Sequence, residues 1–151
     1  MLDSIRDLYQ EVVFDHNRNP RNFRVMEEAT RIIEGHNPLC GDRLTLYVRI
    51  NDEGRVADVS FQGSGCAIFT ASASLMTEIV LGKTEHEAEA LYEMFLGIAT
   101  GTDTSINLES VGKLAVLAGV RAYPARVKCA TLPWRSLQTA LCGSEKSVST
   151  E

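Results

Sequence analysis

The feature that most constrains the fold of this chain is a Cys-x-Asp pair in residues 37–42, which read Asn-Pro-Leu-Cys-Gly-Asp. Cys40 and Asp42 are separated by one glycine, and a thiolate and a carboxylate so placed can bind one metal ion. Proline stiffens the approach to the pair, and Gly41 permits a turn that directs both side chains to one side. Two further cysteines, Cys66 and Cys129, would complete four ligands, so the fold must bring three distant segments together.

Length and composition predict a single globular domain. The chain has 151 residues, of which 44% are hydrophobic and 23% charged, and this is enough to bury a core of its own. We expect one domain over residues 1–142 and a disordered tail over residues 143–151. The net charge of -5 argues against nucleic acid as a partner, because nucleic-acid binding normally rests on a concentrated basic face.

The N-terminal residues and the hydropathy pattern predict a cytoplasmic protein with no membrane partner. The first residues form an amphipathic stretch that contains acidic side chains, which fits neither a secretory signal nor an arginine-rich transit peptide. No apolar run approaches the roughly 20 residues that a membrane helix requires. In a reducing cytoplasm, cysteines are more often metal ligands or reactive groups than disulfide partners.

Hydrophobic periodicity predicts an α+β fold that begins with a helix over residues 5–17. His16 lies at the end of this helix, where we expect a helix-end or surface role. Strands are expected at residues 29–36, 44–50 and 56–61, and the last two are joined by a hairpin at residues 51–54. The first half of the chain is therefore expected to form a small antiparallel sheet.

The second half of the chain is expected to be helical. One helix follows Cys66 and ends at Gly82, and Thr84 with Glu87 forms a capping box for the next helix. Residues 101–108 are a polar linker before a short helical segment over residues 111–117. The last helix contains Pro133, which is tolerated best in a first turn, so we expect this helix to start near residues 129–131.

The cysteines allow two interpretations from their local chemistry. Their spacing is not that of a zinc finger or of a Cys-x-x-Cys redox pair, and free cysteines often pack as small hydrophobic residues. The glycines beside the first two cysteines, the neighbouring Asp42, and the cations Arg126 and Lys128 beside Cys129 favour reactive or metal-binding thiolates instead. Cys142 has no such neighbours and is expected to be an inert residue at a helix end.

Four segments of the chain resemble the IscU/NifU-N family of iron-sulfur cluster assembly proteins, and in particular its SufU branch. They are residues 37–43 (NPLCGDR), 63–67 (GSGCA), 70–74 (TASAS) and 125–132 (ARVKCATL). The likeness spans roughly residues 4–142, and the joint occurrence of the three cysteine motifs is highly specific. The resemblance implies an α+β fold, in which helices pack on a three-stranded antiparallel sheet.

Two features favour the SufU branch over the scaffold branch of this family. Lys128 stands where the scaffold-type proteins carry a histidine before the third cysteine, and residues 100–120 look like an additional segment of SufU proteins. The Leu-Pro-Pro-Val-Lys element, through which scaffold-type proteins bind a chaperone, is kept only in part at residues 123–128. Chaperone-assisted cluster release is therefore not expected.

The resemblance implies a zinc site whose ligands are Cys40, Asp42, Cys66 and Cys129. A site with four protein ligands is closed and redox-inert, so zinc hydrolysis is not expected. SufU proteins accept sulfur from a cysteine desulfurase, here a SufS-like partner, and a downstream iron-sulfur scaffold would then receive it. Cys40, on its loop between proline and glycine, is the acceptor we expect, and Arg126 and Lys128 would support the site or the partner.

Two other functions remain open from the sequence. The same four residues could hold a [2Fe-2S] or [4Fe-4S] cluster under construction, with Asp42 binding it less firmly than a fourth thiolate would. The chain could also be a structural zinc-binding module that only contacts other proteins. Metal content distinguishes the cluster from zinc, and sulfur transfer distinguishes the two zinc-binding functions.

Overall fold

The computed structural model describes residues 2–101, 117, 120, 124–143 and 147–149. Its elements are α1 (Leu2–Arg18), β1 (Arg31–Asn37), β2 (Asp42–Ile50), β3 (Val56–Ser64), α2 (Ala67–Val80), α3 (Glu85–Thr100), α4 (Pro124–Cys142) and β4 (Ser147–Ser149). Strands β3, β2 and β1 are neighbours in that order and antiparallel, and the short β4 pairs in parallel with β1. The predicted α+β fold, with a three-stranded antiparallel sheet, is confirmed.

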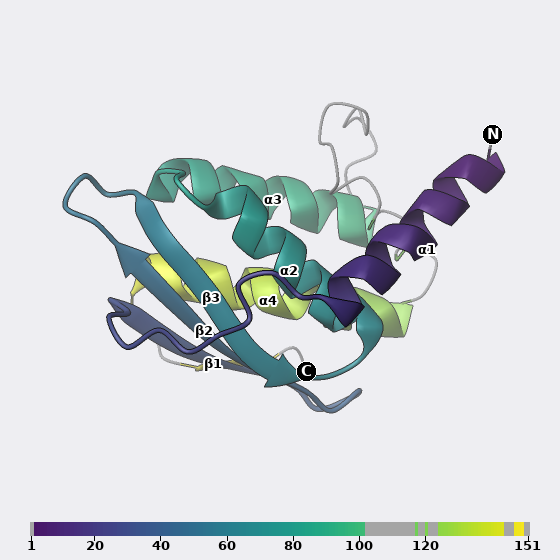
Figure 1. Ribbon diagram of the computed structural model, residues 1–151, viewed down its shortest axis with the longest axis horizontal. Coiled ribbons are helices and arrows are strands. Elements are labelled where there is room, and N and C mark those ends of the chain that lie inside the picture. Colours follow the sequence, from purple (N-terminus) through teal and green to yellow (C-terminus); the bar gives the residue numbers. More distant parts are fainter. Residues whose placement is uncertain (1, 102–116, 118–119, 121–123, 144–146, 150–151) are drawn as a thin grey trace.

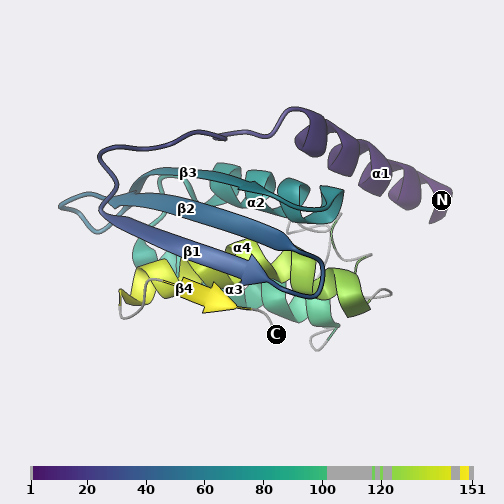
Figure 2. The same cartoon turned by 90° about the horizontal axis from the view of Figure 1, so that it is seen from below.

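Helices α2, α3 and α4 form a layer on one face of this sheet (Figure 1). Helix α4 packs against β1 and β2, α2 packs against β3, and α3 packs against α4. Figure 2 shows the open face of the sheet, with α4 and α3 behind it and α1 extending beyond one end. Since α1 contacts α2, the first helix is attached to the helical layer.

The strands alternate as the sequence predicts, because one face of the sheet is buried and the other is open. In β2, Leu44, Leu46 and Val48 are buried beneath the helices, and the residues between them are more exposed. The predicted hairpin at residues 51–54 is also present. Gly54, in the left-handed region at φ 74°, donates its N–H to the Asn51 carbonyl at 3.0 Å.

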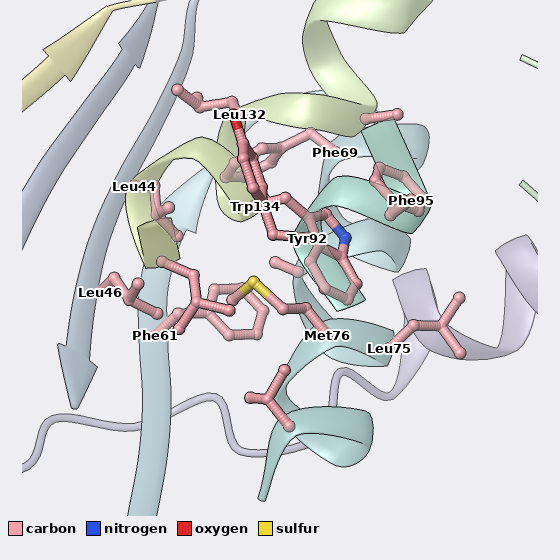
Figure 3. Close-up of a cluster of buried hydrophobic side chains, with 14 of the residues drawn as sticks. Leu44, Leu46, Phe61, Phe69, Leu75, Met76, Tyr92, Phe95, Leu132 and Trp134 are labelled. Carbon is pink, nitrogen blue, oxygen red and sulfur yellow. The ribbon is translucent and has the colours of Figure 1, made fainter. Parts of the chain in front are cut away.

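The core lies between the sheet and the helices and is rich in aromatic side chains (Figure 3). Phe95 of α3 and Trp134 of α4 stack with ring centroids 4.8 Å apart, and both are fully buried. Sheet and α2 residues complete this cluster, among them Leu46, Phe61 and Met76. Burial of this apolar surface stabilises the contact of α4 with the sheet, and α4 carries Cys129.

The predicted capping box at the start of α3 is present. The Thr84 hydroxyl accepts the Glu87 N–H at 3.0 Å, and the Glu87 carboxylate accepts the Thr84 N–H at the same distance. The hydrogen bond from the Thr84 backbone, followed by that from its side chain, lowers the pKa of Glu87. Local sequence thus determines where this helix begins.

The predicted start of the last helix is wrong, because α4 begins at Pro124 and carries Pro133 in its interior. Proline lacks the N–H that would reach the carbonyl four residues earlier, and this typically costs about 3 kcal/mol within a helix. Pro133 is buried, so packing of α4 between the sheet and α3 offsets the missing hydrogen bond. The consequence for the site is that Cys129 lies inside a helix and not at a loop–helix junction.

His16 lies in the last turn of α1, as expected, but its side chain is buried and not on the surface. Its Nδ1 is 2.7 Å from the Ser74 hydroxyl of α2, and its Nε2 is 3.7 Å from the Glu78 carboxylate. The histidine thus joins α1 to α2. The residues around His16 in the sequence contain no signal for such a partner far along the chain.

Within the segment expected to be a disordered tail, Ser147–Ser149 form β4 and pair with Glu34–His36 of β1. The edge of β1 offers unpaired backbone groups, which a passing segment can satisfy. Residues 144–146 and 150–151 lie outside the described residues, as do the predicted linker and helical segment of residues 101–117, apart from Gly101 and Leu117. The domain boundary at residue 142 stays a prediction. Among the described helices, none is long and apolar enough to cross a membrane.

Candidate metal centre

The turn between β1 and β2 places Cys40 on the outside and Asp42 on the inside. Asn37 and Asp42 are cross-strand partners, and the Gly41 N–H donates to the Asn37 carbonyl at 2.9 Å, which closes the turn. Gly41 adopts φ 77°, a conformation that favours glycine. Cys40 is exposed, whereas Asp42 is fully buried. Two residues that are close in sequence therefore lie in very different environments.

The other two cysteines come from helices. Cys66 is the N-cap of α2, as the sequence suggested, and its Sγ accepts the Phe69 N–H at 3.5 Å. Cys129 is fully buried within α4, where its Sγ is 3.7 Å from the Ala125 carbonyl. Helix packing, and not a loop, determines the position of Cys129.

Three of the predicted ligands converge. One ligand atom from each of Cys40, Asp42 and Cys129 lies within 4.8 Å of the other two. Cys66 is not in this set: its Sγ accepts the Phe69 N–H at 3.5 Å, and its backbone N–H donates to Asp42 Oδ1 at 3.0 Å. Cys40, Asp42 and Cys129 therefore meet beside the turn between β1 and β2, and Cys66 adjoins them through its backbone contact with Asp42.

Burial dominates the electrostatics of Cys129. Burial, and after it hydrogen bonds with Asp42, Cys40 and Cys66, raise the pKa of the Cys129 thiol. Burial thus opposes the thiolate form that Arg126 and Lys128 were expected to favour, and that expectation stays a prediction. Binding of a metal would have to displace the proton, as for any thiol ligand.

The two predicted cations differ in what they contact. The pKa of Arg126 is raised by the charge of Cys66 first and by Cys129 less, so the guanidinium lies near both thiols. Arg126 is exposed and Lys128 is half-buried. The Lys128 carbonyl accepts a hydrogen bond from the Thr131 hydroxyl at 3.4 Å.

Two residues at the site have structural roles that the sequence did not indicate. Asn37 is fully buried, and its Nδ2 donates to Asp42 Oδ2 at 3.0 Å and to Cys129 Sγ at 3.5 Å. A Cβ on Gly65 would collide with the Asp42 carboxylate, so only glycine leaves room for that side chain. Each residue adjoins a cysteine motif, but no pattern in one sequence distinguishes it from an ordinary turn residue.

Cys142 lies at the last position of α4, at the opposite end from the Cys129 turn of that helix. It is exposed, and its Sγ accepts a hydrogen bond from Gln138 Nε2 at 3.1 Å. It belongs to none of the contacts that join the other three cysteines. Its placement agrees with the expectation of a helix-end residue.

Comparison with known proteins places this fold and this group of cysteines in a family. Residues 8–130 match the NifU-like N terminal domain. The zinc-dependent sulfurtransferase SufU of Bacillus subtilis is 39% identical over 140 residues, which cover 91% of this chain and 92% of that protein. The iron-sulfur cluster assembly scaffold protein IscU of Streptococcus pyogenes serotype M1 is 38% identical over 140 residues, with coverage of 93% and 86%.

Solved structures agree with this assignment. The crystal structure of FiSufU from Fervidobacterium islandicum AW-1 matches with a TM-score of 0.81 and 35% identity, over 89% of this chain and 96% of that chain. An N-terminal NifU-like protein from Brucella abortus shares the fold, with a TM-score of 0.78 at 24% identity over 91% and 94% of the two chains. The fold and the cysteine group thus define an iron-sulfur cluster assembly domain.

The chain belongs to the IscU/NifU-N family of iron-sulfur cluster assembly proteins. This confirms the resemblance that was drawn from the cysteine motifs, and iron-sulfur cluster assembly as the general function. One of these relatives is named a scaffold and the other a sulfurtransferase, and their identities to this chain are nearly equal. Sequence identity therefore does not decide between the two functions.

Proposed function

We propose that this chain is a zinc-dependent sulfurtransferase, which accepts persulfide sulfur from a cysteine desulfurase on Cys40. One observation carries the proposal: Cys40 is exposed, while Asp42 and Cys129, whose ligand atoms lie within 4.8 Å of its own, are fully buried. A sulfur acceptor needs one thiol that a partner can reach, and it needs other ligands that stay in place. The difference in exposure supplies both.

The donor set suits zinc. Three thiolates and one carboxylate give the four-coordinate environment of closed zinc sites, and the proposed ligands are Cys40, Asp42, Cys66 and Cys129. Bound zinc would keep these thiols deprotonated at neutral pH. Cys66 joins the set if its sulfur turns from the Phe69 amide towards Asp42, which its backbone already contacts.

The transfer is a thiol–persulfide exchange. The Cys40 thiolate attacks the outer sulfur of the desulfurase persulfide, a new S–S bond forms on Cys40, and the donor cysteine leaves as a thiolate. One S–S bond replaces another, so no external oxidant or reductant is needed. Arg126, near Cys66 and Cys129, supplies positive charge towards the anionic persulfide, and the half-buried Lys128 stands two residues further on.

The partners follow from this chemistry. The donor is a SufS-like, pyridoxal-phosphate-dependent cysteine desulfurase, and the recipient is a downstream iron-sulfur scaffold. SufU of Bacillus subtilis supports the assignment, because it is named a zinc-dependent sulfurtransferase and covers nearly the whole chain.

A scaffold function is the second candidate, favoured by the similarity to IscU of Streptococcus pyogenes. The same four residues would then hold a [2Fe-2S] or [4Fe-4S] cluster, which Asp42 would bind more loosely than a thiolate. Metal analysis of protein purified without added iron or sulfide separates the two functions. Near-stoichiometric zinc supports the sulfurtransferase, and a brown protein with iron and labile sulfide supports the scaffold.

Sulfur mapping tests the transfer itself. The protein is incubated with a SufS-like desulfurase and cysteine, and the added sulfur is located by mass spectrometry of its peptides. We expect persulfide on Cys40, and its loss in Cys40→Ser, while Cys142→Ser serves as a matched control that keeps it. Sulfur mainly on Cys129 contradicts the assignment of the acceptor, and no persulfide during turnover leaves only a metal-binding module.

A further inference from the structure

The uncharged side chain of Asn37 lies between two of the proposed metal ligands. It is fully buried at the last position of β1, and its amide nitrogen contacts both the Asp42 carboxylate and the Cys129 sulfur. An amide nitrogen carries two protons, so it can donate one to each acceptor. One side chain therefore links a ligand from the β1–β2 turn to a ligand from α4.

The orientation of this amide follows from its neighbours. Its Oδ1 is buried and has no hydrogen-bond partner among the described residues. Turning the amide over would direct this oxygen at the Asp42 carboxylate, which can only accept hydrogen bonds. A buried acceptor without a partner is unfavourable, so the two donated hydrogen bonds must outweigh it.

Asp42 is held from its other side as well. Its Oδ1 accepts the Cys66 N–H at 3.0 Å, while its Oδ2 accepts the Asn37 amide at 3.0 Å. Each carboxylate oxygen keeps a further lone pair for a cation. Asp42 is thus fixed before any metal arrives, whereas Cys40 has no comparable pair of hydrogen bonds among the described residues.

We propose that Asn37 is a positioning residue of the metal centre, which fixes Asp42 and Cys129 as a pair and leaves Cys40 as the ligand that exchanges. The inference rests on the proposed function for its set of ligands. The N–H directed at Cys129 also withdraws electron density from that sulfur, which lowers its reactivity towards electrophiles. Asn37 therefore acts on the site in two ways, by geometry and by making Cys129 the less reactive thiol.

Two substitutions separate these effects from folding. Asn37→Asp keeps the shape of the side chain but replaces both donors with acceptors beside Asp42, and Asn37→Ala removes the donors without adding charge. Both keep the Asn37 backbone carbonyl that closes the turn with Gly41. Asn51→Asp is the matched control, since it makes the same change in the hairpin at the other end of β2, where the Asn51 oxygen is an acceptor.

The readouts are zinc affinity, by competition with a chelator, and the absorption spectrum of the cobalt-substituted protein. We expect both Asn37 variants to bind zinc 10-fold to 100-fold more weakly than the wild type, the range typical of hydrogen-bond partners of metal ligands. We also expect their sulfur-to-cobalt charge-transfer bands to shift, while Asn51→Asp leaves affinity and spectrum unchanged. A merely structural role would lower stability but would not move the cobalt spectrum of folded protein.

Alkylation tests the second effect in the metal-free chain. Mass spectrometry should find that Cys129 reacts faster with iodoacetamide, relative to Cys66, in Asn37→Ala than in the wild type. If Asn37→Asp does not fold, Asn37→Ala decides the question alone. If Asn37→Ala folds and its zinc affinity, cobalt spectrum and alkylation ratio equal those of the wild type, the inference is overturned. If the wild-type protein itself binds no metal, the proposed function is overturned together with the inference.

Discussion

The β1–β2 turn and helix α4 both contribute residues to the candidate site, but the turn is exposed to solvent and the helix is buried in the core. The turn carries Cys40 in solvent, next to Leu39, whose side chain is 63% exposed. Helix α4 carries Cys129 in the interior, where its neighbours are buried core residues. Segments with few buried contacts open most readily, and core helices open last. For the proposed metal centre, the comparison favours Cys40 as a mobile ligand and Cys129 as a fixed one.

The close contact of α4 with β1 determines where Cys129 lies. A Cβ on Gly35 would lie 2.6 Å from Ser136 Oγ and 3.3 Å from Leu132 Cδ1, so glycine lets the helix approach the strand. Gly35 and Asn37 are two residues apart and share the buried face of β1. This approach brings Cys129 within reach of the Asn37 amide.

Removal of the metal should lower the stability of the folded protein more than any substitution discussed below, because zinc would join the β1–β2 turn to helix α4. A ligand at 1,000 times its dissociation constant stabilises the folded state by about 4 kcal/mol. For a chain of this size, that corresponds to a fall in melting temperature of about 10 °C on chelation. Thermal unfolding of the zinc-loaded protein with and without EDTA measures it. An unchanged melting temperature would mean that the site is wrong or incidental.

The two cysteines should next be compared in metal-free protein. Cys129→Ser buries a hydroxyl where a thiol packed, and we expect a loss of about 1–3 kcal/mol in the free energy of unfolding. Cys40→Ser changes an exposed turn residue, and its effect should stay within about 0.5 kcal/mol. Urea unfolding in EDTA measures both. Equal losses would contradict the division into a fixed and a mobile ligand.

The contact of α4 with β1 can be tested through Gly35→Ala. The added methyl group overpacks the contact with Ser136, which should cost about 1–2 kcal/mol in the free energy of unfolding. Zinc affinity should fall as well, because Cys129 moves with the helix. The double variant Gly35→Ala with Ser136→Ala removes the oxygen that collides and should recover part of the loss, which urea unfolding measures. Additive losses in the double variant would show that the two residues do not interact.

Much of this architecture could be predicted because it is local. Alternation marked the strands of the sheet, and the capping box of Thr84 and Glu87 marked the start of α3. The convergence of Cys40, Asp42 and Cys129 was expected from the chemistry of their motifs and the family resemblance. These features depend on short stretches of sequence or on residue types with few alternative uses.

The parts that escaped prediction depend on contacts between distant segments. Tertiary packing lets Pro133 stand inside α4, against its local preference, so the helix begins earlier than expected. The partner of His16 is Ser74, which is remote in sequence. Asn37 looked like an ordinary turn residue, because its role depends on a sulfur from the other half of the chain.

The smallest effect is expected at Cys142, which shares α4 with Cys129 but none of its surroundings. Cys142 is exposed at the end of the helix, and its sulfur accepts a hydrogen bond from Gln138 on the same helix. Serine can accept the same hydrogen bond, so Cys142→Ser should change the free energy of unfolding by less than about 0.5 kcal/mol. Zinc content and the amount of persulfide on Cys40 should equal those of the wild type, as measured by metal analysis and peptide mass spectrometry. If either fell while the fold stayed intact, a thiol at the far end of α4 would take part in the chemistry, and the contrast between the turn and the helix would have to include a third cysteine.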